Sequence, residues 1–470
     1  MKLLLILLAG LFVLPVSAQK VWTLEECVDY ALKNNLTVKQ SEVSAQMAEI
    51  SKTQALGNMV PSLNGVATHF YNFGKTIDRY TNTFATERVQ SNNFGLSSSV
   101  TLFNGLSNYN QLEQSKLNVE ASKHDVQKSK YDISLQIISS YLQVLYNQEL
   151  ITISKQQIQL TESQVKRTKT LVDAGAAVKG NLLTIESQLA NDQLSLVNAE
   201  NNLNQSALNL ALLLNLDTIV PIKVVRPQID MPVGATIELN PEQMFQIAYE
   251  NMPEIKAARL RTASNEKSVS MAKGSYLPTL QLSASIGTGY SGLNKKGEGE
   301  YLAGYSAYYD PYKTPIYNPI YSYTSFKTKS FGTQFTDNVN RSIGLNLSIP
   351  IFNGFQTQSA VKRAQLNTLN AKISMENAEL QLKRNIYQAY SDAQAALKRY
   401  YANQKASESL QEAFKYTEQR YNVGMVNAID FNDAKNKLAR SQTDLLQAKF
   451  EYIFKLKILD FYQGKPLTLK

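Results

Sequence analysis

An internal duplication is the feature that most constrains how this chain folds. Residues 23–63 align with residues 240–280 without a gap, and residues 96–213 align with residues 345–462 in the same way. Among the paired positions are Phe103-Asn104-Gly105 with Phe352-Asn353-Gly354, Gly175 with Gly424, and Pro61 with Pro278. Similarity of this extent indicates one structural unit that occurs twice.

The duplication divides the chain into parts. We expect a first repeat at 19–214, a linker at 215–239 that contains three prolines, and a second repeat at 240–470. Residues 1–18 have the pattern of a signal peptide, with Lys2, an apolar stretch and a small-residue cleavage site at Val16-Ser17-Ala18. The mature chain is therefore expected to be exported. Its later apolar segments are too short to form membrane-spanning helices. If the chain spans a membrane, we therefore expect it to do so as β-strands.

The sequence pattern of each repeat predicts the same order of elements: helix, strand, loop, strand, long helix, turn, helix. The first helix opens with a capping box, Thr23 to Glu26, and its counterpart opens with Asn240, Pro241 and Gln243. The second copy of this helix is expected to cover about 240–275. Apolar residues recur every seven positions in the last helix of each repeat, which predicts coiled-coil packing. They are Leu182, Leu189, Leu196, Leu203 and Leu210, and Phe431, Leu438, Leu445, Tyr452 and Leu459.

Four segments are predicted to be strands, at about 62–71, 94–103, 279–290 and 342–351. Three of them alternate with period two, apolar on one face and small or polar on the other; the strand after Pro61 is less regular. A half-buried sheet of a soluble protein shows the same alternation. Strands of about ten residues, an export signal and small polar residues opposite the apolar face favour a lipid-facing barrel.

Four strands cannot close a barrel, and an open edge in lipid leaves backbone groups unpaired. The chain is therefore expected to oligomerise. A dimer would supply eight strands and a trimer twelve, and the sequence pattern alone does not choose between them.

The sequence offers little material for catalysis. The chain has one cysteine, Cys27, and two histidines, His69 and His124, and neither histidine has neighbours that suggest a metal or an activated nucleophile. Gly287 to Gly292 matches a dinucleotide-binding pattern, but a tyrosine-rich segment follows where that motif needs a helix. Gly74-Lys75-Thr76 resembles only the end of a phosphate-binding loop. Lysine and arginine are scattered along helices, which argues against nucleic acid as a partner. We predict no catalytic, cofactor-binding or metal site.

The segment 291–335 has no counterpart in the first repeat. Nine of the 26 tyrosines of the chain lie between Tyr290 and Tyr323. Tyrosines can form a girdle at a membrane interface or line a recognition surface. We expect a long external loop that partly closes the mouth of the barrel. Recognition of a ligand by this loop is the less favoured hypothesis.

Asp430 and Asp433 lie three residues apart just after Gly424, on neighbouring positions of one helix face. Carboxylates that stabilise the first turn of a helix would look the same. In a closed oligomer, however, symmetry repeats each carboxylate into a ring, and such rings select or hold cations in a pore.

Taken together, the duplicated unit and the run from Arg420-Tyr421 through Gly424 to Asp430 and Asp433 resemble the TolC-type outer-membrane efflux ducts, the outer membrane factor family. The resemblance covers essentially the whole mature chain. It implies a fold that is mainly α with transmembrane β: a homotrimer with a 12-stranded β-barrel in outer-membrane lipid on a 12-stave α-helical tunnel in the periplasm. It also implies that a periplasmic adaptor (membrane fusion protein) and an inner-membrane exporter dock at the helical tip.

The resemblance assigns roles to single residues as well. Asp430 and Asp433 match the aspartate ring of the family's periplasmic entrance, Tyr421 matches the tyrosine of its closing lock, and Gly175 and Gly424 stand at the tip turns. The sequence departs from the family where Val426 stands in place of the lock arginine and Asn181 in place of an acidic partner. These departures leave open whether the resting entrance is closed.

The sequence therefore predicts a passive, non-enzymatic channel of a tripartite efflux or type I secretion system in the outer membrane. A periplasmic coiled-coil scaffold or adaptor is the alternative. The residues identify neither the exported substrate nor the cognate pump.

Overall fold

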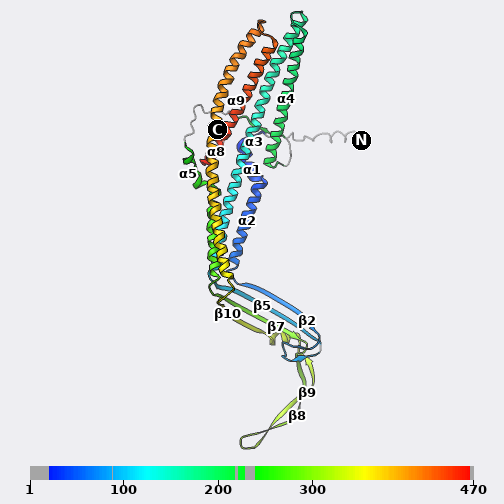
Figure 1. Ribbon diagram of the computed structural model, residues 1–470. Coiled ribbons are helices and arrows are strands. Elements are labelled where there is room, and N and C mark those ends of the chain that lie inside the picture. The colour runs from blue at the N-terminus through cyan, green and yellow to red at the C-terminus, as the bar shows by residue number, and fades with distance from the viewer. Residues whose placement is uncertain (1–20, 87, 217–220, 228–238, 466–470) are drawn as a thin grey trace, which may run out of the picture. The chain divides into compact units, whose positions relative to one another are not determined.

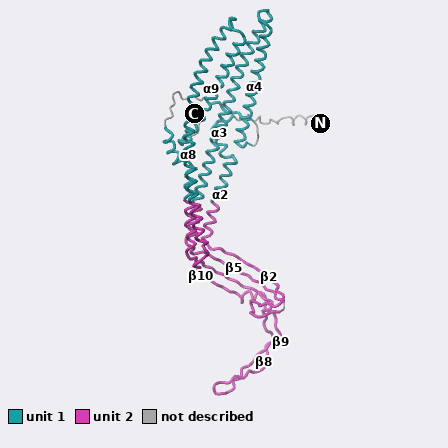
Figure 2. Tube along the Cα trace, viewed as in Figure 1, with its two compact units in different colours: residues 1–48, 117–262, 369–470 teal, residues 49–116, 263–368 magenta. Residues whose placement is uncertain are grey.

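The computed structural model describes residues 21–86, 88–216, 221–227 and 239–465, so the predicted signal peptide and part of the predicted linker lie outside the described residues. The chain forms two compact units (Figure 2). Unit 1 contains 1–48, 117–262 and 369–470, and unit 2 contains 49–116 and 263–368. Each unit draws segments from both predicted repeats. The units are thus not the repeats themselves.

Helices related by the duplication have equal or nearly equal lengths (Figure 1). The pairs are α1 (Leu24–Asn34) and α5 (Pro241–Asn251), α2 (Leu36–Gly57) and α6 (Pro253–Gly274), α3 (Ser107–Asp173) and α8 (Gln356–Asn422), and α4 (Lys179–Leu214) and α9 (Ala428–Tyr462). The two long helices, α3 and α8, have 67 residues each. At about 1.5 Å per residue, each is about 100 Å long. Among the described residues, none of the helices combines the length and apolar character needed to cross a bilayer.

Both predicted helix starts are confirmed. The Thr23 hydroxyl accepts from the Glu26 amide and the Glu26 carboxylate accepts from the Thr23 amide, while Asn240 and Gln243 make the same reciprocal pair. The prediction of one continuous helix over about 240–275 is wrong. Met252 interrupts it with an extended backbone (φ −65°, ψ 130°), because proline at the next position disfavours helical geometry.

The first repeat has the same interruption without a proline. Asn35 is extended (φ −64°, ψ 129°) between α1 and α2. Its side-chain oxygen accepts from the Thr37 amide at 2.9 Å and its side-chain nitrogen donates to the Leu213 carbonyl at 3.0 Å. Asparagine competes with helical hydrogen bonds in this way, so its side chain stabilises the break.

The core of unit 1 includes three apolar clusters, of which the smallest is formed by Phe414, Phe431 and Leu438. The first surrounds a short parallel pairing of β1 (Val21–Trp22) with β6 (Lys223–Val224), and the buried Tyr141 hydroxyl donates to the Val225 carbonyl at 2.7 Å. The second cluster joins α5, α6, α8 and α9 through Met244, Ile255, Ile386 and Leu459. Tertiary packing of this kind, more than intrinsic propensity, stabilises long helices.

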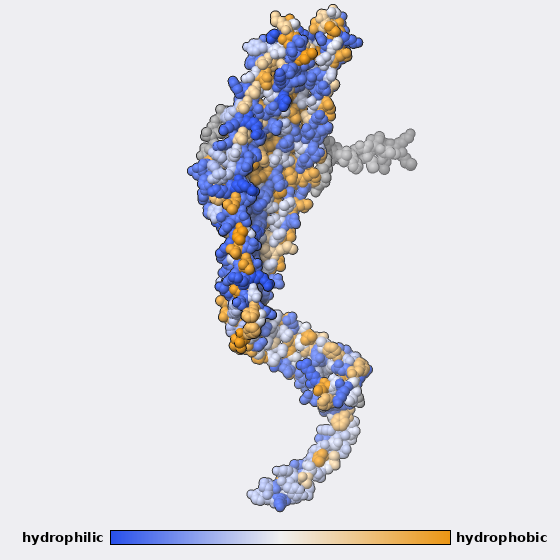
Figure 3. Space-filling model, in the orientation of Figure 1, coloured by the Kyte–Doolittle hydropathy of each residue, from blue (hydrophilic) through white to orange (hydrophobic). Residues whose placement is uncertain are grey.

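Unit 2 contains an antiparallel four-stranded sheet in the order β10-β7-β5-β2. Its strands are β2 (Ser62–Asn72), β5 (Val89–Asn104), β7 (Thr279–Ser291) and β10 (Asn340–Ser348). Directly paired residues share a face. One face carries the rows Leu96–Ile286–Arg341 and Val100–Leu282–Leu345, and the other carries the serine row Ser97–Ser285–Ser342. Apolar side chains therefore lie at the surface of the strands, as Figure 3 shows in this unit.

The strands differ at their ends from the predicted 94–103 and 342–351. β5 is longer because it pairs along its length with both β2 and β7. β10 stops at Ser348, shortly before Pro350, which has no backbone N–H to offer a neighbouring strand.

The prediction that 291–335 is a long loop is wrong in its detail, since the segment has regular structure. β8 (Lys295–Tyr309) and β9 (Pro315–Thr328) form a two-stranded antiparallel sheet of their own, and α7 (Phe331–Asp337) follows them. The Tyr-rich sequence favours strand, because aromatic residues are common in strands. A second small sheet pairs β3 (Thr76–Ile77) with β4 (Phe84–Ala85).

The helix ends of unit 2 pack against each other at a pair of glycines. A Cβ atom on Gly274, the last residue of α6, would lie 2.5 Å from the carbonyl oxygen of Gly105. Gly105 itself has a φ of +64°, which favours glycine. The two backbones can approach this closely only because neither residue has a side chain.

Candidate functional site

Each helical hairpin of unit 1 turns at a glycine. Gly175 (φ +73°) lies two residues after the end of α3, and Gly424 (φ +81°) lies two residues after the end of α8. Both turns close with the same backbone bond, Ala176 N–H to the Leu171 carbonyl and Met425 N–H to the Arg420 carbonyl. This is the glycine-terminated end that helices commonly adopt. The sequence places the same turn at both hairpin tips.

Asp430 and Asp433 lie in the first turns of α9, both exposed. The Asn427 side-chain oxygen accepts from the Asp430 amide at 2.8 Å and caps the helix. Asp433 is paired with Lys437, 2.7 Å from carboxylate to ammonium. A surface pair at this spacing contributes little stability. Both carboxylates therefore remain accessible to solutes near the tip.

Tyr421 lies beside an arginine, although not at the position that the resemblance suggested. Its ring packs on Phe431, with centroids 4.6 Å apart, and the Arg167 guanidinium lies 5.5 Å from the ring centroid. Arg167 also donates to the Asn422 carbonyl at 2.6 Å and to its side-chain oxygen. Arg167 comes from α3, so it ties the first hairpin to the second. Val426 lies in the α8–α9 turn and the exposed Asn181 in the first turn of α4, and neither side chain carries a charge.

A buried ion pair lies further along the hairpins. The Lys435 ammonium on α9 is 2.6 Å from the Asp192 carboxylate on α4 and donates to the Thr161 hydroxyl on α3 at 2.6 Å. The Thr161 hydroxyl lies 2.5 Å from the same carboxylate, and the Gln188 amide donates to its other oxygen at 2.8 Å. Lys435 is 1% exposed. The cluster joins three helices of the two hairpins.

Sequence reasoning missed this pair, although a signal was present. Lys435 lies four residues after Phe431, and Asp192 lies three after Leu189, so each occupies an inward position of its heptad. Charged residues are almost never fully buried unless they are paired. Two opposite charges at core positions of neighbouring helices were the available clue.

The other sequence motifs form no site in the structure. Gly287–Gly292 lies along β7 and leads to β8, and Gly74-Lys75-Thr76 leads into β3. His69 on β2 contacts the Asn92 side chain, and His124 lies on α3. Within the described residues, His, Cys, Asp and Glu side chains nowhere gather in a group of three or more that could hold a metal ion.

The hairpin tips expose apolar side chains. In the first hairpin these are Leu171 and Val178, and in the second Val423, Met425 and Ile429, of which the last three are each more than two-thirds exposed. Contiguous exposed apolar residues mark interaction surfaces. This surface, Leu171, Val178, Val423, Met425 and Ile429, is called the tip surface below.

Comparison with known proteins gives a consistent result. The sequence matches the outer membrane efflux protein family over residues 27–216 and 244–459. The outer membrane protein TolC of Escherichia coli (strain K12) is 26% identical over 201 residues, which are 42% of this chain and 34% of TolC. The matched region thus spans about a third of the length of that curated relative.

Solved structures resemble the chain over most of its length. CusC, from a study of its folding and transmembrane channel formation, has a TM-score of 0.74 at 15% identity, covering 94% of this chain and 92% of CusC. The outer membrane protein VceC of Vibrio cholerae has a TM-score of 0.71 at 15% identity, covering 94% and 96%. The predicted fold class and the predicted family resemblance are confirmed. The alternative of a periplasmic scaffold or adaptor gains no support from these comparisons.

Proposed function

Because this chain belongs to the outer membrane efflux protein family, we propose that it is the passive, non-enzymatic duct of a tripartite efflux or type I secretion system. The protein lies in the outer membrane, with its helical part in the periplasm. As a duct it exports small molecules or proteins that a separate pump selects.

The four-stranded sheet of unit 2 carries the proposal. Its two faces differ, one with exposed Ile343, Leu345 and Leu347 and the other with paired serines. Such a sheet suits lipid on one side and water on the other. Its edge strands, β2 and β10, pair on only one side within the described residues. Since backbone groups in lipid must be paired, edges of neighbouring copies join, and three copies give the twelve strands of the family's barrel.

The Asp430 and Asp433 carboxylates form the periplasmic entrance ring of the duct. Three copies bring six carboxylates to one opening, and a concentration of negative charge favours cations. Tyr421 with Arg167 forms the lock that holds the second hairpin against the first. In this chain the arginine of the lock comes from α3, which compensates for Val426.

The tip surface is the docking site for partners. A periplasmic adaptor, bound in turn to an inner-membrane exporter, covers these apolar side chains. Their exposure in an isolated chain would otherwise be costly, and a partner removes them from water.

Recording single channels in planar bilayers tests the proposal. The purified full chain should give a native mass of three copies and a cation-selective conductance. Asp430→Asn with Asp433→Asn removes six charges per trimer and should weaken cation selectivity and block by multivalent cations. Asp173→Asn, which removes an exposed carboxylate at the end of α3, is the matched control and should change both less.

Two results would count against the proposal. Absence of any conductance from a folded trimer would contradict the duct. Equal cation selectivity in the Asp430/Asp433 double variant and the wild type would be compatible with a duct but would contradict the proposed entrance ring.

A further inference from the structure

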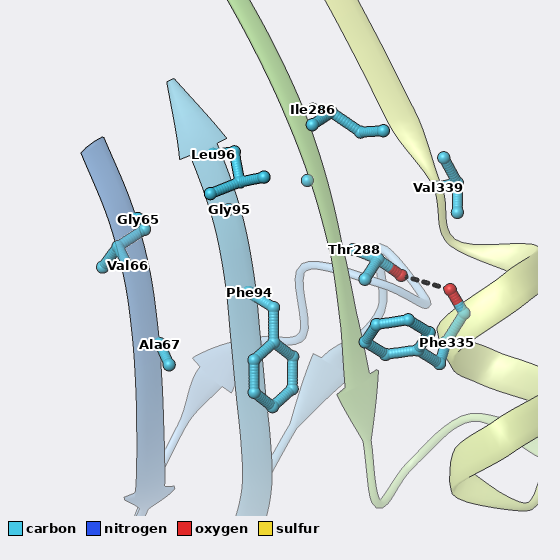
Figure 4. Close-up of a pocket in the computed structure, with 11 residues that line it drawn as sticks. Gly65, Val66, Ala67, Phe94, Gly95, Leu96, Ile286, Thr288, Phe335 and Val339 are labelled. Atoms are coloured by element: carbon cyan, nitrogen blue, oxygen red, sulfur yellow. Dashed lines mark hydrogen bonds between the residues drawn. The ribbon is translucent and has the colours of Figure 1, made fainter. Parts of the chain in front are cut away.

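Helix α7 and the sheet of unit 2 enclose an apolar groove of about 480 Å³. Figure 4 shows its lining, which includes Phe94 and Leu96 of β5, Ile286 and Thr288 of β7, Phe335 of α7 and Val339. The strand residues Phe94, Leu96, Ile286 and Thr288 all project from the apolar face of the sheet, because Phe94 pairs with Thr288 and Leu96 pairs with Ile286.

The groove is held in shape by specific contacts. The Thr288 hydroxyl donates to the Phe335 carbonyl at 2.6 Å, and the Phe335 ring lies 5.8 Å from the Phe94 ring. Gln334, fully buried, accepts from the Ser291 amide and donates to the Ser291 carbonyl, both at 2.9 Å. α7 is thus fixed to the sheet at one end of the groove. An apolar groove with fixed walls can select an apolar ligand.

A basic side chain adjoins the groove. Arg341 on β10 pairs directly with Ile286, so its side chain shares the apolar face. Its guanidinium is exposed, and within the described part of the chain it makes no side-chain hydrogen bond or ion pair. The nearby Asp337 carboxylate is instead paired with Lys329 at 3.5 Å. An unpaired arginine on a lipid-facing surface is unfavourable unless it reaches the interface or an anion.

The order of the strands and helices along the chain indicates at which side of the membrane the groove lies. β7 begins just after α6, and β10 ends just before α8, so α7 lies at the strand ends remote from these helices. With the helices in the periplasm, α7 lies toward the outer surface of the membrane. Lipid of the outer leaflet is therefore the molecule that meets both the groove and Arg341.

We propose that this groove binds a phosphate-bearing lipid of the surrounding membrane, with an acyl chain between α7 and the sheet and the phosphate on Arg341. Burial of methylene groups provides the affinity for the chain. The guanidinium, which can bind phosphate through two parallel hydrogen bonds, provides the preference for the headgroup. The proposal depends on the outer-membrane placement of the chain and not on its transport activity.

Native mass spectrometry of the full chain in mild detergent tests the site. The ligands are phosphatidylglycerol and, with the same acyl chains but no phosphate, diacylglycerol. The wild type should bind phosphatidylglycerol at least about tenfold more tightly, the preference that a charge-assisted pair supplies. Arg341→Gln should remove this preference and retain the weaker binding of both lipids. Arg363→Gln, on the exposed surface of α8 in the same unit, should leave it unchanged.

A second variant tests the groove itself. Val339→Trp fills the space between α7 and the sheet and should reduce the binding of both lipids, while single-channel conductance, measured in parallel, stays at the wild-type level. Conductance separates loss of the lipid site from loss of the duct.

Several results would overturn the proposal. One is an unchanged lipid preference in Arg341→Gln. Another is competition by inorganic phosphate alone that displaces diacylglycerol as well, which would indicate a site without an acyl component. A third is a native mass of six copies without bound lipid, which would indicate that a second trimer covers this face.

Discussion

Loss of the Lys435 ammonium should destabilise the helical hairpins far more than loss of a neighbouring surface lysine. Lys435→Met keeps the length of the side chain but leaves the Asp192 carboxylate, only 10% exposed, without its cation. Removing one partner of a buried pair costs about 3–5 kcal/mol of unfolding free energy, because the other charge stays desolvated. The Thr161 and Gln188 hydrogen bonds remain and place the expected cost near the lower end of that range.

The matched control lies two residues away on the same helix. Lys437→Met breaks the pair with Asp433, whose members are 63% and 59% exposed. Pairs at this spacing contribute about 0.3–0.5 kcal/mol. The two substitutions therefore make the same chemical change in opposite environments.

Urea unfolding of the detergent-solubilised protein, followed by circular dichroism of the helices, measures both effects. The double variant Lys435→Met with Asp192→Leu removes both charges, and it should recover most of the stability that the single variant loses. A double-mutant cycle with Asp192→Leu should give a coupling of at least about 2–3 kcal/mol, because each single variant leaves the other charge buried and the double variant leaves neither. The reasoning fails if Lys435→Met costs no more than Lys437→Met, or if the two substitutions at 435 and 192 are simply additive.

Three further outcomes follow from the structure. Partial burial raises the pKa of Glu254 above its ordinary value of 4.5, so the folded chain holds this proton more tightly and loses stability as pH rises above 4.5. Urea titrations across that window should show Glu254→Gln gaining stability relative to the wild type; a pH-independent difference would contradict it. A second variant replaces 295–328 with a short glycine link, which is feasible because the flanking residues Asn294 and Lys329 are already hydrogen-bonded to each other. The native mass of its assembly should equal that of the wild type. A shift to monomer would show that assembly depends on the β8–β9 sheet. Gly274→Ala should cost about 1–3 kcal/mol in urea unfolding because its Cβ meets a backbone carbonyl, whereas the repeat-related Gly57→Ala, with open space around it, should not.

The sequence predicted those features that depend on local pattern. Reciprocal caps at Thr23 and Asn240, the glycine turns at Gly175 and Gly424, and the heptads of the last helices all rest on neighbours in the chain. The break at Met252 also has a local cause, Pro253, but we expected a continuous helix there and missed it. Asn35 gives no comparable signal, because its hydrogen bond to the Leu213 carbonyl joins residues distant in sequence.

The candidate site was predictable only in part for the same reason. Asp430, Asp433 and Tyr421 were found from one continuous run. Arg167 was missed because it reaches Asn422 from another helix, 255 residues away in the chain. The pairing of Lys435 with Asp192 depends on how three helices pack together, and this packing cannot be predicted from a single sequence. Tertiary contacts of this kind need the structure.

The buried ion pair also bears on the ancestry of the chain. In the alignment of the two repeats, the counterpart of Lys435 is Glu186 and the counterpart of Asp192 is Ser441. A chain assembled from two first repeats would therefore set a glutamate against Asp192, and one assembled from two second repeats would set Lys435 against a serine. Neither half can replace the other. Gene fusion made this specialisation possible, because a fused chain can divide one ion pair between halves that once were identical.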